Sequence, residues 1–311
     1  MAASARVKLP KKYARAHGRR RRKRGFFKKR ARQIERLLFL AGVGLVLLLF
    51  LKLAVGLILK GPSTPIDLRD VEAMRIPIAS LVRLDELSEE RGLPFGELLT
   101  LYSVENRFFP EKSPGLGADG LEAQFVSSYG RIKNKYSASA LRPFVSLLTS
   151  ITDEVRHFPV AGPPEGGEAP YTYGDSWGAP RGGRVHEGCD ILDRDNVRGR
   201  LQVVSMTDGV VENFGWNDLG GYYVGITARS GNYYYYAHLD RWADGVEKGA
   251  EVAAGELLGY MGDTGYGAEG AAGSFQVHLH VGICPAAKIT GKEYWINPYP
   301  FLRLEEERKS G

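Results

Sequence analysis

A run of 23 almost entirely apolar residues divides the chain. Residues 37–59 read LLFLAGVGLVLLLFLKLAVGLIL and contain one charge, Lys52. As an α-helix rising ~1.5 Å per residue, the run would extend roughly 34 Å, which is enough to cross the hydrocarbon core of a bilayer. A core helix of a soluble domain would have polar residues on one side, whereas this one is apolar all round. The run therefore predicts one transmembrane helix.

The charge before the run predicts its orientation. Residues 1–36 hold 16 Lys and Arg and one acidic residue, Glu35, although the whole chain has a net charge of only +6. Because basic flanks stay in the cytoplasm, we predict a cytoplasmic tail over 1–36 and an extracytoplasmic body after residue 60, anchored in the cell membrane. A cleaved signal peptide is the competing interpretation, but its apolar stretch is normally ~7–15 residues long. The body is net acidic, so we expect no nucleic-acid partner.

Composition divides the body into further parts. Residues 60–75 are a polar, proline-containing linker. Residues 76–157 predict a small helical module, because apolar side chains such as Leu98, Leu99 and Tyr102 recur at helical spacing. No group of chemically active residues stands out there. We interpret the module as a spacer, a gate over the catalytic domain or a surface for a protein partner.

The pattern changes to β-structure in the last part of the chain. A Pro- and Gly-rich stretch marks the boundary, so we place a mainly β domain at 158–304 and a polar tail at 305–311. The predicted strands, which favour paired antiparallel sheets, include Val203–Val204, Gly209–Val211, Tyr222–Thr227, Tyr233–His238, Val252, Leu257–Met261 and Gln276–Ile283. Cys189 and Cys284 fit one disulfide or two buried thiols.

Two histidine clusters in this domain have the spacing of metal ligands. His186 and Asp190 form an H-x-x-x-D motif in a glycine-containing, non-helical segment. Histidine nitrogen and aspartate oxygen both bind zinc well. His278 and His280 are two residues apart on a predicted strand, so both point to the same face. A non-catalytic zinc site is an alternative, but structural sites are usually closed by four ligands that often include Cys.

A third cluster lies in the tyrosine-rich run 233–240. On a regular strand, Tyr234, Tyr236 and His238 would share one face. A lone histidine of this kind is more often structural than functional.

These segments together resemble the M23 family of zinc metallopeptidases, the lysostaphin-type or LytM-like cell-wall endopeptidases. The resemblance covers roughly residues 171–301. The matching segments are Arg184-Val-His-Glu-Gly-Cys-Asp-Ile191, Thr207-Asp-Gly-Val-Val211, Gly220-Gly221, Tyr236-Ala-His-Leu239, Gly255-Glu-Leu-Leu-Gly259, Gly262-Asp-Thr-Gly265, His278-Leu-His280 and Asn297-Pro298.

The resemblance implies a role for each of five residues. His186, Asp190 and His280 are similar to the family's Zn²⁺ ligands, and His278 and His238 to its catalytic histidines. It implies a β-rich fold with the metal in an open groove. The expected activity is zinc-dependent hydrolysis of peptide bonds in peptidoglycan cross-links or stem peptides. The alternative is a non-cleaving protein that binds peptidoglycan or activates another cell-wall hydrolase.

Overall fold

The computed structural model describes residues 42, 44, 52, 71–106, 121–135, 138–162, 167–286 and 294–310. Contacts divide the chain into two units, Met1–Gly61 and Pro62–Gly311. The expected tail 1–36, nearly all of the expected span 37–59 and the first part of the linker lie outside the described residues. No helix among the described residues is long and apolar enough to cross a membrane.

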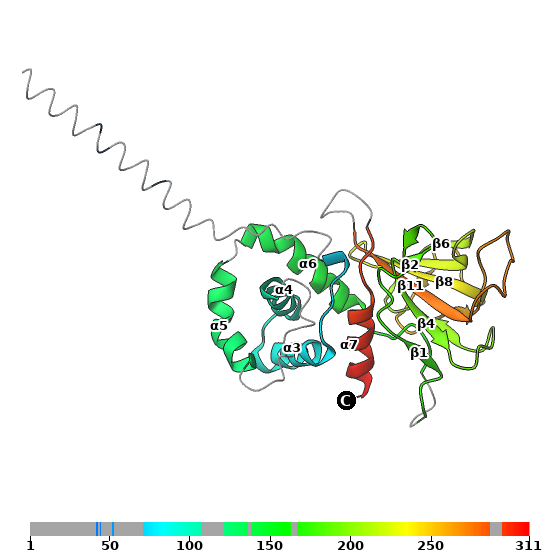
Figure 1. Ribbon diagram of the computed structural model, residues 1–311, viewed down its shortest axis with the longest axis horizontal. Helices are drawn as coiled ribbons and strands as arrows, with labels where there is room; N and C mark the ends of the chain where they lie inside the picture. The colour runs from blue at the N-terminus through cyan, green and yellow to red at the C-terminus, as the bar shows by residue number, and fades with distance from the viewer. Residues whose placement is uncertain are drawn as a thin grey trace, which may run out of the picture. The chain divides into compact units, whose positions relative to one another are not determined.

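Helices form the first part of the second unit (Figure 1). They are α3 (Ile78–Arg91), α4 (Phe95–Glu105), α5 (Leu121–Lys135) and α6 (Ala138–Glu154). The helical spacing seen in the sequence identifies the buried sides of α4 and α6. Leu98, Leu99 and Tyr102 of α4 are buried, as are Leu148 and Ile151 of α6. The apolar periodicity of this segment therefore marks its core.

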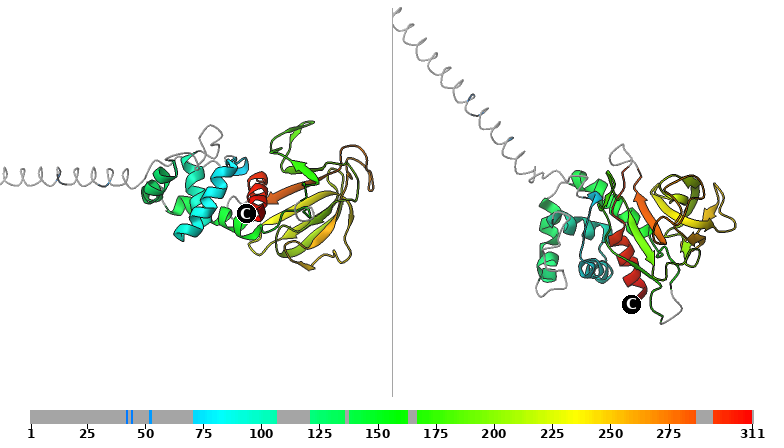
Figure 2. Two further views of the ribbon diagram at one scale, coloured as in Figure 1. Left: turned by 90° about the horizontal axis from the view of Figure 1, so that it is seen from below. Right: turned by 45° about the vertical axis from the view of Figure 1, so that its right-hand side comes forward.

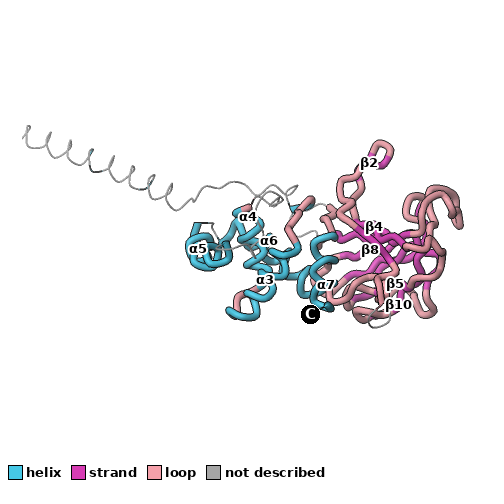
Figure 3. Tube along the Cα trace, turned by 60° about the horizontal axis from the view of Figure 1, so that its bottom comes forward, coloured by secondary structure: helices cyan, strands magenta, loops and turns pink. Residues whose placement is uncertain are grey.

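An antiparallel sheet forms most of the remainder (Figure 1). The strands are β1 (Tyr171–Tyr173), β2 (Pro180–Arg181), β3 (Arg184–Val185), β4 (Cys189–Asp193), β5 (Gln202–Val204), β6 (Gly209–Asn217), β7 (Gly221–Thr227), β8 (Tyr233–Trp242), β9 (Glu251–Val252), β10 (Leu257–Met261) and β11 (His278–Cys284). Nine of them join in one sheet, with the order β1-β4-β11-β8-β7-β6-β9 and with β10 and β5 branching from β8. The short β2–β3 hairpin projects from the rest of the domain (Figure 3).

The long strand β8 explains why the expected pair of sheets is one connected sheet. Residues 233–237 of β8 pair with β11, whereas residues 239–242 pair with β10. Because β8 pairs with both, the strands on the β11 side and the pair β10–β5 are joined by backbone hydrogen bonds through this one strand. The prediction of antiparallel β-structure is thus confirmed, but within the described residues the paired sheets are continuous.

Helix α7 (Tyr299–Ser310) lies between the helical segment and the sheet (Figures 1 and 2). Tyr173 of β1 donates a 2.8 Å hydrogen bond to Glu306, and Arg308 forms two bonds of 2.7 and 2.8 Å with Asp85 of α3. The polar tail expected at 305–311 is therefore helical through Ser310, since its charged side chains pair across this contact.

Cys189 and Cys284 are both buried free thiols. Of the two interpretations open from the sequence, the structure contains the pair of small buried side chains.

A carboxylate on α6 fastens the helical segment to the sheet. Glu154 accepts hydrogen bonds of 2.9 and 3.0 Å from the backbone N–H and hydroxyl of Ser230. It also accepts from Asn232 Nδ2 at 3.0 Å and from Tyr234 Oη at 3.1 Å. The side chains of Asn232 and Tyr234 are buried, so without Glu154 their donors would lose this acceptor away from solvent.

Replacing Glu154 with alanine is expected to lower the free energy of unfolding by about 2 kcal/mol, because buried donors left without an acceptor cost roughly 1–3 kcal/mol. Denaturant titration of the full-length chain measures this loss. The control is Asp153→Ala, at the adjacent exposed position on the same helix, with an expected change within ~0.5 kcal/mol. Equal effects of the two substitutions would contradict a fastening role for Glu154.

Candidate active site

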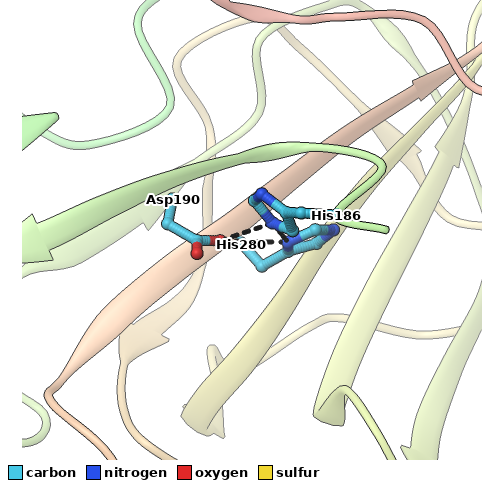
Figure 4. A group of neighbouring side chains, drawn as sticks. All are labelled: His186, Asp190 and His280. Atoms are coloured by element: carbon cyan, nitrogen blue, oxygen red, sulfur yellow. Dashed lines mark hydrogen bonds and ion pairs between the residues drawn. The ribbon is translucent and has the colours of Figure 1, made fainter. Parts of the chain in front are cut away.

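Strand register brings His186, Asp190 and His280 together. His280 on β11 lies directly opposite Asp190 on β4 in the antiparallel pairing. His186 precedes β4 by three residues, and the chain between them turns its side chain toward the same point. The two imidazole rings and the carboxylate meet there (Figure 4).

The three side chains converge through one atom each. His186 Nε2 lies 3.0 Å from Asp190 Oδ1 and 2.9 Å from His280 Nδ1. His280 Nδ1 is 3.1 Å from the same carboxylate oxygen. Two nitrogens and one oxygen, all potential electron-pair donors, thus lie within 4.8 Å of one another. This set fits a zinc ion, which accepts both ligand types.

Contacts with Ser176 and Arg181 fix the orientation of His186 and Asp190. His186 Nδ1 is 2.9 Å from the carbonyl oxygen of Ser176, to which it donates when Nε2 is the free nitrogen. The Ser176 hydroxyl accepts the backbone N–H of Asp190 at 3.1 Å. Arg181, on the β2–β3 hairpin, forms an ion pair with Asp190 Oδ2 and leaves Oδ1 toward the two histidines. A metal ligand held in this way is preorganised.

Burial and charge set the protonation of the cluster. Burial alone would raise the pKa of Asp190, yet the adjacent His186 and His280 rings hold it well below its ordinary range. Burial lowers the pKa of His280, although Asp190 opposes this effect. The carboxylate is therefore ionised and the His280 ring is biased toward its neutral, ligating form.

His278 and His238 stand beside this cluster. His278 Nε2 is 3.9 Å from Asp190 Oδ1, and the His278 and His238 rings are 4.6 Å apart. Their Nδ1 atoms lie 2.7 Å from the carbonyl oxygens of Gln276 and Thr264, respectively. An Nδ1–H donated to each carbonyl leaves Nε2 as a proton acceptor.

Both rings are biased toward the neutral form. Burial, reinforced by the neighbouring His278, lowers the pKa of His238 to about 3. Burial likewise lowers the pKa of His278, against the attraction of Asp190. A neutral imidazole can take a proton from a reacting group, which is the requirement for a general base.

His238 reaches the groove because β8 contains a bulge. His238 has φ +62°, and the pairing with β7 shifts so that Tyr222 faces Leu239 but Val224 faces Tyr236. This irregularity breaks the two-residue alternation of the strand. The expectation that His238 shares a face with Tyr234 and Tyr236 is therefore wrong. Those two tyrosines are fully buried, and His238 instead lines the groove.

Apart from Arg184, which begins one of the matching segments, the groove contains groups that the sequence motifs did not single out. It encloses about 410 Å³, and its lining beyond the histidines and Asp190 includes Arg181, Arg184, Asn213, Asn217, Leu219, Tyr223, Tyr233, Tyr235, Tyr266 and Trp295. None of the described residues that line it comes from α3–α6. The described helices thus contribute no residue to this lining, and the spacer, gate and partner-surface interpretations of the helical module all stay predictions.

A residue that precedes the helical segment nevertheless contacts the loop at Asp175 and Ser176, which supports the predicted ligands. Arg75, just before α3, places Nε 2.9 Å from Asp175 Oδ2. Asp175 adjoins Ser176, whose carbonyl and hydroxyl hold His186 and Asp190. Asp175 Oδ1 also accepts a 3.2 Å hydrogen bond from Asn297.

Replacing Asp175 with alanine should weaken zinc binding by about tenfold, because loss of an outer-shell partner typically costs ~10–100-fold in metal affinity. Competition with a chelator, using the full-length chain, measures the dissociation constant. Asp244→Ala, which removes an exposed carboxylate in the turn after β8, is the matched control. Unchanged zinc affinity in the Asp175 variant would show that the loop keeps its position without this residue.

Comparison with known proteins places these residues in a recognised domain. A sequence model described as Peptidase family M23 matches residues 184–293. The L-Ala–D-Glu endopeptidase of Bacillus subtilis (strain 168) is 41% identical over 140 residues, which are 44% of this chain and 41% of that protein. The chain thus aligns with less than half the length of this curated relative.

A solved structure is similar over most of the chain. It comes from Ruminococcus gnavus ATCC 29149 and is provisionally described as a glycyl-glycine endopeptidase, LytM. It is 37% identical, and the alignment covers 76% of this chain and 90% of that chain with a TM-score of 0.62.

Proposed function

The chain belongs to peptidase family M23, and from that premise we propose that it is a zinc-dependent endopeptidase acting on bacterial peptidoglycan. The observation that carries the proposal is the convergence of three ligand atoms beside two buried imidazoles, at a groove that His186, Asp190, His238 and His280 line. Three protein ligands of this kind leave a coordination position open, as catalytic zinc sites do. His186, Asp190 and His280 would hold the ion.

In the proposed mechanism, His278 and His238 accept the proton of the attacking water and orient that water. When bound, zinc supplies Lewis-acid chemistry that makes a water nucleophilic at neutral pH and polarises a peptide carbonyl. His278 is the proposed proton acceptor, because its Nε2 lies 3.9 Å from Asp190 Oδ1 while Gln276 fixes the ring through Nδ1. His238, fixed by Thr264 through Nδ1, would orient the attacking water through its free Nε2.

The proposed scissile bond is L-Ala–D-Glu in the stem peptide. The 41% identity to a protein that bears this activity in its name supports the assignment. Mass spectrometry of a stem peptide and of pentaglycine, each incubated with the full-length chain, tests it. Cleavage between L-Ala and D-Glu is expected, whereas cleavage of pentaglycine alone would reject this bond while retaining a peptidase.

A non-cleaving binding or activating protein is the less favoured function. Such a protein would not need a complete set of three ligands and two buried, acceptor-oriented histidines. All five are present and adjacent in this chain.

We also propose that residues 37–59 tether the catalytic domain to the outer face of the cytoplasmic membrane. The apolar run and the basic residues before it support this topology. The full-length chain should remain with membranes after an alkaline wash, and added protease should reach the domain only from the outer side. Release by the wash would contradict the tether.

A further inference from the structure

One wall of the groove consists of four aromatic rings. Tyr223, Tyr233, Tyr235 and Trp295, here called the aromatic platform, all line the groove that holds the predicted ligands. Neighbouring ring centres are 5.4–6.4 Å apart, so the rings form a continuous surface. The ring of Tyr235, which neighbours all three other rings, is 6.1 Å from that of His280, so the platform lies next to the proposed zinc site.

The rings lie over the sheet because glycines leave room for them. A Cβ atom at Gly225 would come within 2.0 Å of the Tyr233 hydroxyl, and one at Gly282 within 2.7 Å of the Trp295 ring. Tyr233 and Trp295 thus each have the backbone of a neighbouring strand on one side and border the groove on the other. A side chain larger than glycine at either position would push its ring away from the sheet.

The platform is rigid and uncharged. Tyr233 donates a 2.7 Å hydrogen bond to Asn213 Oδ1, and Tyr235 accepts one of 2.7 Å from Asn217 Nδ2. Burial raises the pKa of Tyr235 to about 12, and the pKa of Tyr233 also lies above its ordinary value because of burial. Both hydroxyls therefore stay protonated at neutral pH.

The cationic groups of the groove come from a different element. Arg181 and Arg184 lie on the β2–β3 hairpin and line the same groove as the platform. The groove thus combines an uncharged aromatic and amide surface with positive charge. A ligand that matches it has a ring-sized apolar face next to an acidic group.

We propose that the aromatic platform binds a sugar of the glycan strand, so that the enzyme cuts stem peptides still attached to their glycan. The proposal rests on the proposed peptidase function. In an L-Ala–D-Glu stem the first residues are small and acidic, and only the attached sugar offers a ring-sized apolar face. The C–H face of a pyranose stacks on aromatic rings, while its hydroxyl and acetamido groups can bond to the amides and phenols of the wall.

Two substrates with the same peptide test the inference. One is a stem tetrapeptide linked to its disaccharide, and the other is the free tetrapeptide. For the full-length chain, kcat/KM for the linked substrate is expected to exceed that for the free peptide about tenfold, the effect of one good aromatic stacking contact. Trp295→Ala and Tyr233→Ala should each remove most of that preference while changing cleavage of the free peptide less than about threefold.

Matched variants separate stacking from general damage. Tyr233→Phe keeps the ring and should keep most of the preference. Tyr260→Ala removes a half-buried tyrosine of β10 that stacks on Arg241 outside the groove, and should leave the preference unchanged. Equal cleavage of the two substrates by the unaltered chain would overturn the proposal, as would equal losses on both substrates in the Trp295 and Tyr233 variants.

A binding measurement keeps the test independent of cleavage. Tryptophan fluorescence of the full-length chain is titrated with the tetramer of N-acetylglucosamine, which contains no peptide. Saturable binding that weakens at least about fivefold in Tyr233→Ala supports the platform, since stacking contacts have this size. Absence of binding overturns it. Failure to cut either peptide substrate would reject the proposed function, and the sugar titration would still decide whether the platform binds glycan.

Discussion

Asp190→Ala is expected to lose zinc and with it all measurable cleavage of peptidoglycan. The Asp190 carboxylate is the centre of the cluster, because Oδ1 lies 3.0 Å from His186 Nε2 and 3.1 Å from His280 Nδ1. Its removal leaves two nitrogens, which are too few to hold a catalytic zinc ion as three ligands do. The loss of zinc affinity should exceed the ~10–100-fold cost of an outer-shell change.

Zinc per chain, measured by atomic emission after dialysis, is the direct readout for this variant. Asp195→Ala removes an exposed aspartate in the turn that follows β4 and should retain both zinc and activity. His186→Ala should reproduce the loss seen with Asp190→Ala. A folded Asp190 variant that retains one zinc per chain would show that other residues hold the ion.

His278→Ala and His238→Ala should lose turnover but retain zinc, whereas Asp190→Ala loses both. Neither ring contributes an atom to the converging ligand set, yet both stand beside it. Loss of a general acid–base group typically lowers the rate about 10²–10⁴-fold. We therefore expect kcat to fall in that range for each variant, while zinc content stays that of the unaltered chain.

The matched control for these variants is His157→Ala. His157 lies after α6 and bonds to the carbonyl of Phe158 rather than lining the groove. It should change neither zinc content nor kcat. Full activity in the His278 variant would refute its assignment as the proton acceptor, and loss of zinc would place that residue among the ligands instead.

Much of the candidate site follows from local rules of the sequence. The side chains of His278 and His280 share a face because strand residues alternate, and both are adjacent to Asp190 in the structure. Most of the predicted strands fall within observed strands because β-branched and aromatic residues are concentrated between glycines, although the predicted strand Gln276–Ile283 starts two residues before β11. Such features depend on a few consecutive residues, which is why one sequence is enough to predict them.

The remaining features depend on contacts between distant segments. The position of His238 needs the bulge in β8, and the tyrosine run around it gives no sign of where the alternation breaks. Arg181 reaches Asp190 only because the β2–β3 hairpin folds back, and Arg75 reaches Asp175 across 100 residues of chain. The charged end of α7, expected as a polar tail, likewise contacts Asp85 and Tyr173, which lie far from it in the chain.

The central claim is tested most directly by digesting purified peptidoglycan with the full-length chain, with chelator and with zinc added back, and identifying released fragments by mass spectrometry. The account predicts soluble peptide fragments that disappear with chelator and return with zinc. Stoichiometric zinc without cleavage of any wall preparation, or cleavage that chelator leaves unchanged, would contradict it.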